Sequence, residues 1–282
     1  METRSVVIAG CGYLGEAAAG FFLSSGWRVC GLCASLESAQ RLETAPFPVM
    51  VKDISQPLTA EKEWLSPDLL IHCASSGRGG EDAYRAVYLE GLKNLIAAYA
   101  PKRTIFTGST SVYAEVDGSW VAEDSQANPD RATGRILLEA EAVALDAGGT
   151  VARLSGIYGP GRSVLLRKYL DRSAMLEGGG MRWINQTHRD DAARALLVLA
   201  DAPAGIYNVS DNTPATQREV YGWIACHLGG SLPPEGPADT GRKRGWTSKR
   251  VDNAKLRQIG WSPMFPSYRE ALPGLLAPMT PD

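Results

Sequence analysis

The chain has 282 residues, with 29 basic and 31 acidic side chains and a hydrophobic fraction of 44%. This length is sufficient for a complete α/β domain with an appended lobe and for a sizeable apolar core. Because the formal net charge is only −2, the composition gives no electrostatic argument for binding nucleic acid or an anionic membrane. We therefore expect a small-molecule substrate, and we leave a homodimer open.

The N-terminal stretch "METRSVVIAG" leads directly into an apolar strand pattern and has none of the features of a signal peptide. No later stretch approaches the roughly 20 apolar residues that a membrane span requires. We therefore expect a cytoplasmic protein. The five cysteines have neither the spacing of a disulfide scaffold nor that of a zinc site with two CxxC pairs. We expect no metal, and we expect Cys30 and Cys33, inside an apolar strand pattern, to be buried free thiols.

The first half of the chain alternates short apolar runs with helical patterns, as is typical of a parallel sheet with crossover helices. The apolar runs are continuous, which is typical of strands that are buried on both faces. Strands are predicted at 5–10, 27–34, 48–54, 68–74, 104–110 and 150–159, and helices at 14–26, 38–43, 82–100 and from 132 onward. This order predicts an α/β fold with a doubly wound parallel sheet, a Rossmann fold, and a ligand crevice outside the carboxyl ends of the strands.

The alternation breaks after Gly159. A helical centre lies there between glycine-rich ends, and a helix (188–201) and a strand (205–211) follow before a more irregular remainder. We predict a dinucleotide-binding domain over 1–160, to which 185–211 returns. The smaller, discontinuous C-terminal lobe, comprising 161–184 and 212–282, is predicted to bind the substrate.

The stretch "GCGYLG" has the GxGxxG spacing between a predicted strand and a predicted helix. In such a loop the first glycine (Gly10) permits a tight turn, the second (Gly12) lets the backbone approach a pyrophosphate, and the third (Gly15) lets the helix pack closely. The anion is then bound at the helix N-terminus. We predict that these glycines, with Tyr13 and Leu14 between them, bind a dinucleotide.

The end of the second strand indicates which dinucleotide is bound. An acidic residue there would bind the ribose 2′-hydroxyl of NAD, but this chain has "CAS", residues 33–35. Ser35 can donate a hydrogen bond to a 2′-phosphate and Arg41 can supply charge, so we prefer NADP and keep NAD open. For Arg41 an ordinary exposed helix position also stays open.

Two later strand ends are further candidates for cofactor contacts. Asp53 follows the third strand, where it is either an adenine contact or a plain turn carboxylate, and both interpretations stay open. Ala74 and Ser75 follow the fourth strand, where we expect them beside the middle of the cofactor.

Several motifs together resemble the extended short-chain dehydrogenases/reductases, the group that includes nucleotide-sugar epimerases and dehydratases. They are "GCGYLG", "KDI", "HCAS", "GSTSVY", "RLSGIYGPGR", "HRDD" and "NAKLRQIGW", and they span almost the whole chain. The chain is most similar to atypical members of the NAD-dependent epimerase/dehydratase-like type. The resemblance implies a Rossmann fold, a nicotinamide dinucleotide and a cleft between sheet and lobe.

In that group, proton transfer uses a serine after the fifth strand and a tyrosine and lysine four residues apart on the next helix. Ser109 matches the serine, but Thr133 and Leu137 occupy the tyrosine and lysine positions. A free tyrosine has a pKa near 10 and needs a nearby cation to act as a base near neutral pH. Because neither replacement ionises usefully, the chain is predicted to lack the usual Tyr/Lys relay.

Three other residues are candidates for the missing acid–base group. Tyr113 lies where the resemblance places a substrate-side residue, and our hypothesis is that it acts as the acid with Arg135 or His188 nearby. The alternatives also stay open: a packed tyrosine with a bonded hydroxyl, a surface ion pair of Arg135 with Glu139, and a structural histidine.

For the substrate, the resemblance implies contacts from Ser111, Tyr158 and Arg162. A guanidinium at 162 could bind a carboxylate or a phosphate. A further basic cluster, 242–250, is either a solvated flap or an anion clamp.

We expect an NAD(P)-dependent oxidoreductase acting on a small carbonyl, imine or hydroxy compound. Two alternatives remain open: an epimerase- or dehydratase-type isomerase or lyase that retains its dinucleotide, and a non-catalytic sensor of NADP(H). The fold resemblance alone does not choose among them.

Overall fold

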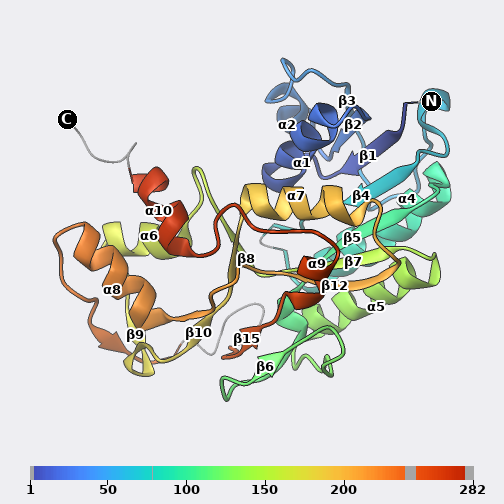
Figure 1. Ribbon diagram of the computed structural model, residues 1–282. Helices are drawn as coiled ribbons and strands as arrows, with labels where there is room; N and C mark the ends of the chain where they lie inside the picture. Colours follow the sequence, from blue (N-terminus) through green and yellow to red (C-terminus); the bar gives the residue numbers. More distant parts are fainter. Residues whose placement is uncertain (1–2, 78, 239–245, 277–282) are drawn as a thin grey trace.

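A seven-stranded parallel sheet forms the centre of the computed structural model, which describes residues 3–77, 79–238 and 246–276. The strand order is β12-β7-β5-β4-β1-β2-β3, and every neighbouring pair is parallel (Figure 1). The strands are β1 (Ser5–Ala9), β2 (Arg28–Cys33), β3 (Val49–Val51), β4 (Leu69–His72), β5 (Thr104–Ser109), β7 (Thr150–Leu154) and β12 (Gly205–Val209). The order reverses direction at β1, as in a doubly wound sheet, so the predicted fold class is confirmed.

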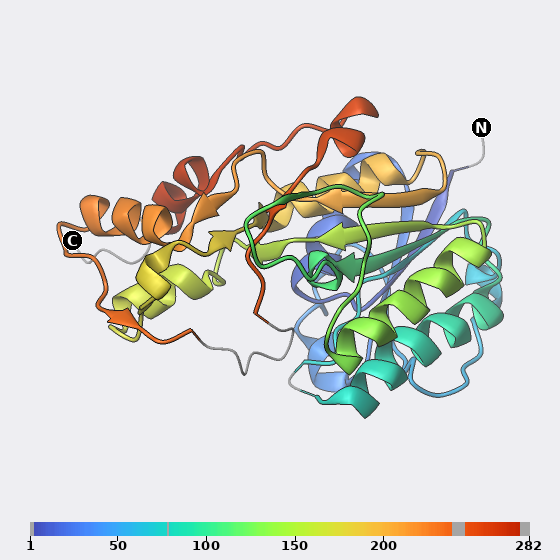
Figure 2. The same cartoon turned by 90° about the horizontal axis from the view of Figure 1, so that it is seen from below.

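Helices cover both faces of this sheet (Figure 2). One face carries α1 (Tyr13–Ser24) and α7 (Arg189–Leu199), which pack against each other and against the apolar side chains of β1 and β4. The other face carries α5 (Ala132–Asp146) beside the long helix predicted at 82–100. That helix is α3 (Glu81–Tyr84), a π-helical segment η2 (Arg85–Glu90) and α4 (Gly91–Tyr99) in direct succession.

A buried histidine bonds to the π-helical segment. His72, at the end of β4, is fully buried and its Nε2 donates to the carbonyl of Val87, 2.9 Å away. Burial lowers the pKa of His72, which keeps it a neutral core residue. The widened turn places Tyr88 on the wall of the cleft described below.

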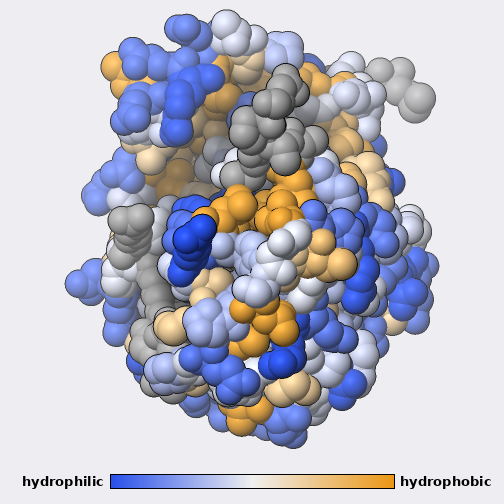
Figure 3. Space-filling view, turned by 90° about the vertical axis from the view of Figure 1, so that its left-hand side faces the viewer, coloured by the Kyte–Doolittle hydropathy of each residue, from blue (hydrophilic) through white to orange (hydrophobic). Residues whose placement is uncertain are grey.

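The lobe lies to one side of the sheet (Figure 1) and has its own apolar cluster, which includes Leu166, Tyr221 and Tyr268. Its elements are α6 (Val164–Leu170), β9 (Leu176–Glu177), η4 (Gly178–Gly180), β10 (Trp183–Ile184), β13 (Ala215–Thr216), α8 (Gln217–His227), β14 (Glu235–Gly236) and α10 (Tyr268–Leu276). Seen from the lobe end, apolar surface gathers near the centre of the face and hydrophilic surface surrounds it (Figure 3). The domain boundaries remain a prediction.

Short elements join the lobe to the sheet domain. The pairs β8 (Gly156–Tyr158) with β11 (Gln186–His188), and β6 (Trp120–Val121) with β15 (Arg250–Val251), are both parallel. The remaining short elements are α2 (Leu36–Gln40), η1 (Lys62–Trp64), η3 (Thr110–Val112) and α9 (Ala254–Gln258). Asp191 is fully buried in α7, and its carboxylate accepts from the backbone N–H groups of Met264 and Phe265 at 2.6 and 3.0 Å. Within the described part of the chain, no helix combines the length and apolar character needed to cross a membrane.

Candidate active site

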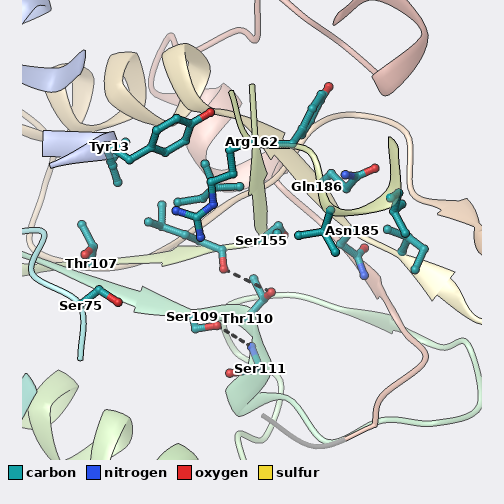
Figure 4. A pocket seen from close by; sticks show the side chains of 18 of the residues that line it. Tyr13, Ser75, Thr107, Ser109, Thr110, Ser111, Ser155, Arg162, Asn185 and Gln186 are labelled. Atoms are coloured by element: carbon teal, nitrogen blue, oxygen red, sulfur yellow. Dashed lines mark hydrogen bonds between the residues drawn. The ribbon is translucent and has the colours of Figure 1, made fainter. Parts of the chain in front are cut away.

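A cleft of about 1310 Å³ lies at the carboxyl ends of the central strands, between the sheet and the lobe (Figure 4). Its sheet side, which we call the cofactor half, is lined from the glycine loop, the ends of β2, β4 and β5, and α5. Its other side, the lobe half, is lined mainly by residues 155–186, Gln217, Tyr221, Thr247 and Lys249. Ligand pockets commonly measure about 300–1,000 Å³, so this cleft has room for two ligands side by side.

The glycine loop forms the closed end of the cofactor half. Gly10 has φ +84°, and a Cβ there would lie 2.3 Å from the backbone N and Cα of Ala74. A Cβ on Gly15 would lie 2.5 Å from the carbonyl oxygen of Gly10, whereas a Cβ on Gly12 meets no protein atom within 4 Å. Gly10 and Gly15 are therefore required by the fold itself. Gly12 faces open space, as the approach of a ligand to the backbone requires.

Other predicted cofactor residues divide into those that line the cleft and those that do not. Tyr13, Leu14, Ala74 and Ser75 line it together with Gly10 and Gly12, and Gly15 lies beneath it. One side-chain hydrogen bond near Ser75 also links β5 to β4. The hydroxyl of Thr107 also lines the cleft and donates to the carbonyl of His72, 2.8 Å away.

At the far end of the cofactor half, Ser35 and Asp53 do not line the cleft. Ser35 is exposed and caps α2, where its Oγ accepts from the N–H of Ser38. The exposed carboxylate of Asp53 accepts from the N–H and the hydroxyl of Ser55 at 3.0 and 2.7 Å. In the structure each oxygen serves a local turn, and the two cofactor contacts stay predictions.

Arg41 and Ser38 are the polar residues that the structure brings to this end of the cleft instead. Arg41 donates from Nη2 to the Oγ of Ser38, 3.1 Å away, and both line the cleft close to Cys33. Cys30 and Cys33 are buried free thiols, as expected, and burial raises the pKa of both thiols. The cofactor half also contains one carboxylate, Glu16, from the first turn of α1.

The predicted absence of the Tyr/Lys relay has a structural counterpart on α5. Leu137 is buried and lines the cleft, so an apolar side chain stands where the group's lysine would be. Thr133 lines a small adjoining cavity together with Leu137, Ser111 and Thr247. Ser109 lines the cleft, and its Oγ accepts from the N–H of Ser111 at 3.2 Å (Figure 4).

Tyr113 does not lie where the acid hypothesis requires it. Its side chain is fully buried and is not among the residues that line the cleft. The hydroxyl donates to Oδ1 of Asn208 at 2.9 Å, and the guanidinium of Arg153 lies 4.9 Å from the ring centre. Burial raises the pKa of Tyr113, which further opposes proton donation near neutral pH. This placement favours the alternative of a packed tyrosine with a bonded hydroxyl over the acid hypothesis.

Arg135 and His188 also lie outside the cleft lining. Arg135 is exposed and donates to the carbonyl of Asp130 at the start of α5. His188 is buried, and its Nδ1 accepts from the N–H of Asp190, so it caps α7. Burial lowers the pKa of His188, and the ring packs 4.2 Å from that of Phe265. The structure therefore does not bring Arg135 or His188 to the cleft wall, and their catalytic roles stay predictions.

The three residues expected on the substrate side do line the cleft. Ser111 lies on the wall formed by η3, and Tyr158 is buried with its hydroxyl donating to the carbonyl of Ser267 at 3.4 Å. Arg162 projects into the cavity on the side of Tyr13 (Figure 4), with its guanidinium 5.2 Å from that ring centre. Arg162 therefore stands at the boundary between the two halves.

The lobe half contains polar residues that the sequence did not single out. Arg182 and Glu177 lie on its wall with Nε and Oε2 3.7 Å apart, and Gln217 accepts from the N–H of Glu177 at 2.8 Å. Lys249 is only 4% exposed, and burial lowers its pKa to about 8. No sequence motif marked Arg182 or Glu177, whereas Lys249 lies within the predicted basic cluster. Residues 242–245 of that cluster lie outside the described part of the chain.

The strand order, the glycine loop and the cleft define a Rossmann-type α/β protein with a ligand cleft that polar and charged side chains line. The chain belongs to the NAD dependent epimerase/dehydratase family, whose model matches residues 6–210.

Individual proteins are similar to the chain in sequence or in structure. Protein YeeZ of Escherichia coli (strain K12) is 27% identical over 279 residues, 93% of this chain and 97% of YeeZ. A candidate NAD-dependent epimerase/dehydratase from Methylobacillus flagellatus is 28% identical, with a TM-score of 0.79 over 99% of each chain. A dTDP-glucose 4,6-dehydratase from Bacillus anthracis str. Ames, solved in complex with NAD, has the same fold. It is 16% identical, with a TM-score of 0.79 over 98% of this chain and 96% of that chain.

Proposed function

We propose that the protein is an NADP(H)-dependent oxidoreductase that acts on a small carbonyl, imine or hydroxy compound. The support is one continuous cleft of about 1310 Å³ that can hold a dinucleotide and a second ligand at once. Its cofactor half is formed largely by backbone and small residues, which suits an extended dinucleotide. Its lobe half carries charged and polar side chains, which suit a small polar substrate.

The choice of NADP rests on one observation, the position of Arg41. The end of β2 carries no carboxylate to bind a ribose 2′-hydroxyl, and a 2′-phosphate there would not be repelled. Arg41 and Ser38 line the cleft beside this strand end and offer a guanidinium and a hydroxyl to a phosphate. The carboxylate of Glu16 comes from α1, not from β2.

Fluorescence titration with NADPH and NADH tests this choice. Arg41→Gln is expected to weaken NADPH binding about tenfold, because a charge-assisted hydrogen bond is lost, and to leave NADH binding unchanged. Arg4→Gln is the control, since Arg4 pairs with Asp201 and does not line the cleft. A clear preference of the unaltered protein for NADH would overturn the proposal for NADP.

Hydride transfer to a carbonyl also needs a proton for the developing oxyanion, and a bound nicotinamide dinucleotide supplies only the hydride. Leu137 cannot assist, and Ser109 offers a neutral hydroxyl. Of the Lys, Arg, Asp and Glu side chains that line the cleft within the described residues, five lie in the lobe half and two, Glu16 and Arg41, lie in the cofactor half. In the proposed reaction the proton therefore comes from the lobe side.

A second function, an epimerase- or dehydratase-type reaction with a retained dinucleotide, is favoured by the family and by the dehydratase of the same fold. The two functions differ in their cofactor balance. An oxidoreductase consumes one NADPH per product and binds the cofactor reversibly, whereas a retained cofactor co-purifies in oxidised form and shows no net consumption. Absorbance at 340 nm during turnover, combined with analysis of the nucleotide released by denaturation, separates them. A sensor would bind the cofactor without turnover.

A further inference from the structure

Arg182 is a half-buried arginine with few partners among the described residues. Its side chain is 14% exposed, and its Nε is buried without a hydrogen-bond partner among the described residues. The nearest carboxylate oxygen, Oε2 of Glu177, is 3.7 Å from Nε, beyond hydrogen-bond distance. That carboxylate also accepts from the indole N–H of Trp246 at 3.1 Å. Because arginine cannot lose its charge in a protein, such a half-buried guanidinium is suited to binding an anion.

Lys249 is a buried cation on the same wall. Its ammonium donates to the carbonyl of Tyr113 and to Oγ1 of Thr247, both 2.9 Å away. An ammonium has three N–H donors, so one remains for a ligand. The charged groups that face it are Glu115, which raises its pKa, and Arg182, which lowers it; burial has the largest effect and lowers it to about 8.

Two contacts place Lys249 between the segment of Arg182 and the cavity beside Leu137. The backbone carbonyl of Lys249 accepts from Nδ2 of Asn185, 2.8 Å away. Asn185 directly follows β10, which begins next to Arg182, so this bond joins the backbone at Lys249 to the segment that carries Arg182. Thr247, bonded to the ammonium, also borders the small cavity that Leu137 and Ser111 line. Lys249 thus stands next to the site where the family's proton relay is missing, but it approaches from the lobe side.

The charge balance of the lobe half supports an anionic ligand. Among the described residues, its charged lining side chains are four cations and one carboxylate, namely Arg162, Lys168, Arg182, Lys249 and Glu177. Like charges in a shared, partly desolvated site repel each other, and a bound anion relieves that repulsion.

We propose that Arg182 and Lys249 form one subsite for a small carbonyl compound that carries an anionic group, a carboxylate or a phosphate. Arg182 binds the anion, and Lys249 donates a hydrogen bond and then a proton to the carbonyl oxygen. This proposal rests on the proposed oxidoreductase function. In the reaction, a bound nicotinamide dinucleotide would supply the hydride for the carbonyl carbon. As the C=O π bond breaks, the oxygen takes the proton from Lys249. The neutral amine regains a proton from solvent.

The test uses the chemistry of the amine and requires no known substrate. The full chain is incubated with glyoxylate, glycolaldehyde phosphate or neutral glycolaldehyde, each with cyanoborohydride, and the modified lysines are identified by peptide mass spectrometry. The neutral amine attacks the aldehyde carbon and water leaves. Hydride from the reagent then reduces the imine to a stable secondary amine. Lys62, exposed and outside the cleft lining, reports general reactivity.

At least one anionic aldehyde is expected to modify Lys249 about tenfold faster than the neutral aldehyde, relative to Lys62. The faster of the two anionic probes identifies carboxylate or phosphate as the preferred group. The rate at Lys249 is expected to rise with pH and level off above about pH 8.

Arg182→Gln is expected to lower the ratio of anionic to neutral labelling at Lys249 about tenfold, which corresponds to about 1.4 kcal/mol. The ratio cancels any change that the variant causes in the pKa of Lys249. Arg182→Lys, which keeps the charge, is expected to restore part of the ratio, and the thermal unfolding temperature checks that both variants fold.

Two results would overturn the proposal: no labelling of Lys249 while Lys62 reacts, or a ratio that Arg182→Gln leaves unchanged. A second measurement distinguishes a failure of the proposed oxidoreductase function from a failure of the subsite. NADPH titration addresses the cofactor half alone, and absent NADPH binding with intact anion-dependent labelling would refute the oxidoreductase and retain the subsite.

Discussion

The two halves of the cleft differ in what forms them: backbone geometry in the cofactor half and charged side chains in the lobe half. The cofactor half uses backbone geometry, because Gly10 and Gly15 bring β1, β4 and α1 so close that a single methyl group would collide. The lobe half uses side-chain charge, because its wall holds Arg182 and the buried Lys249. The first half should therefore fail through steric changes, and the second should respond to changes of charge and pH.

The largest effect is expected from Gly10→Ala. A Cβ at this position would lie 2.3 Å from the backbone of Ala74, and φ is +84°, so both sterics and backbone strain oppose alanine. We expect the free energy of unfolding to fall by about 3 kcal/mol or more, as measured by urea denaturation. A loss below about 1 kcal/mol would contradict the close approach of β1 and β4. Gly20→Ala, on the exposed face of α1 with nothing within 4 Å of the new Cβ, is expected to be neutral or stabilising.

Lys249→Met is expected to raise the free energy of unfolding, whereas Gly10→Ala lowers it. The pKa of Lys249 is lowered from 10.5 to about 8, so its protonated form destabilises the folded state. This cost is fully present below about pH 8 and disappears as the pH rises towards 10.5, because the unfolded chain binds more protons in that interval. We expect the variant to unfold with a free energy about 1–3 kcal/mol higher at pH 7.

The pH dependence of that difference is the decisive measurement. Urea denaturation of both proteins at pH 7, 8.5 and 10 should show the advantage of Lys249→Met shrinking with pH. Lys62→Met, at an exposed position, is the control and should change little at any pH. An advantage that stays constant with pH would point to better packing of methionine and would remove the charge argument for the lobe half.

Gly12→Ala separates binding from stability within the cofactor half. The new Cβ meets no protein atom within 4 Å, and φ at this glycine is −113°, outside the left-handed region that favours glycine. The methyl group would instead occupy the space where a pyrophosphate approaches the backbone. We expect NADPH affinity to fall about tenfold to a hundredfold, or about 1.4–2.7 kcal/mol, with unchanged unfolding. Unchanged affinity would place the cofactor elsewhere in the cleft.

The same contrast explains what could be predicted from the sequence. The strands, the helices and the glycine loop were predicted because their signals are local: a run of apolar residues or the spacing of three glycines within six positions. Ser35 and Asp53 lie outside the cleft lining, because a hydroxyl or a carboxylate after a strand can equally serve a turn. The pairing of Arg182 with Lys249 could not be predicted, because the two residues come from separate segments that only the tertiary fold brings together.

Tyr113 shows how far local reasoning extends, and its replacement gives the smallest of the expected effects. Sequence position placed it correctly after β5, but the turn of η3 directs its side chain into the core. Tyr113→Phe removes the hydrogen bond to Asn208, whose amide keeps its other bond to the carbonyl of Asp252. We expect a loss of about 1 kcal/mol in unfolding free energy and no change in NADPH affinity. The stacked Arg153 still faces an aromatic ring in phenylalanine, so little else is lost. A large fall in NADPH affinity with unchanged stability would instead return Tyr113 to the cleft, and would weaken the division between a steric half and a charged half.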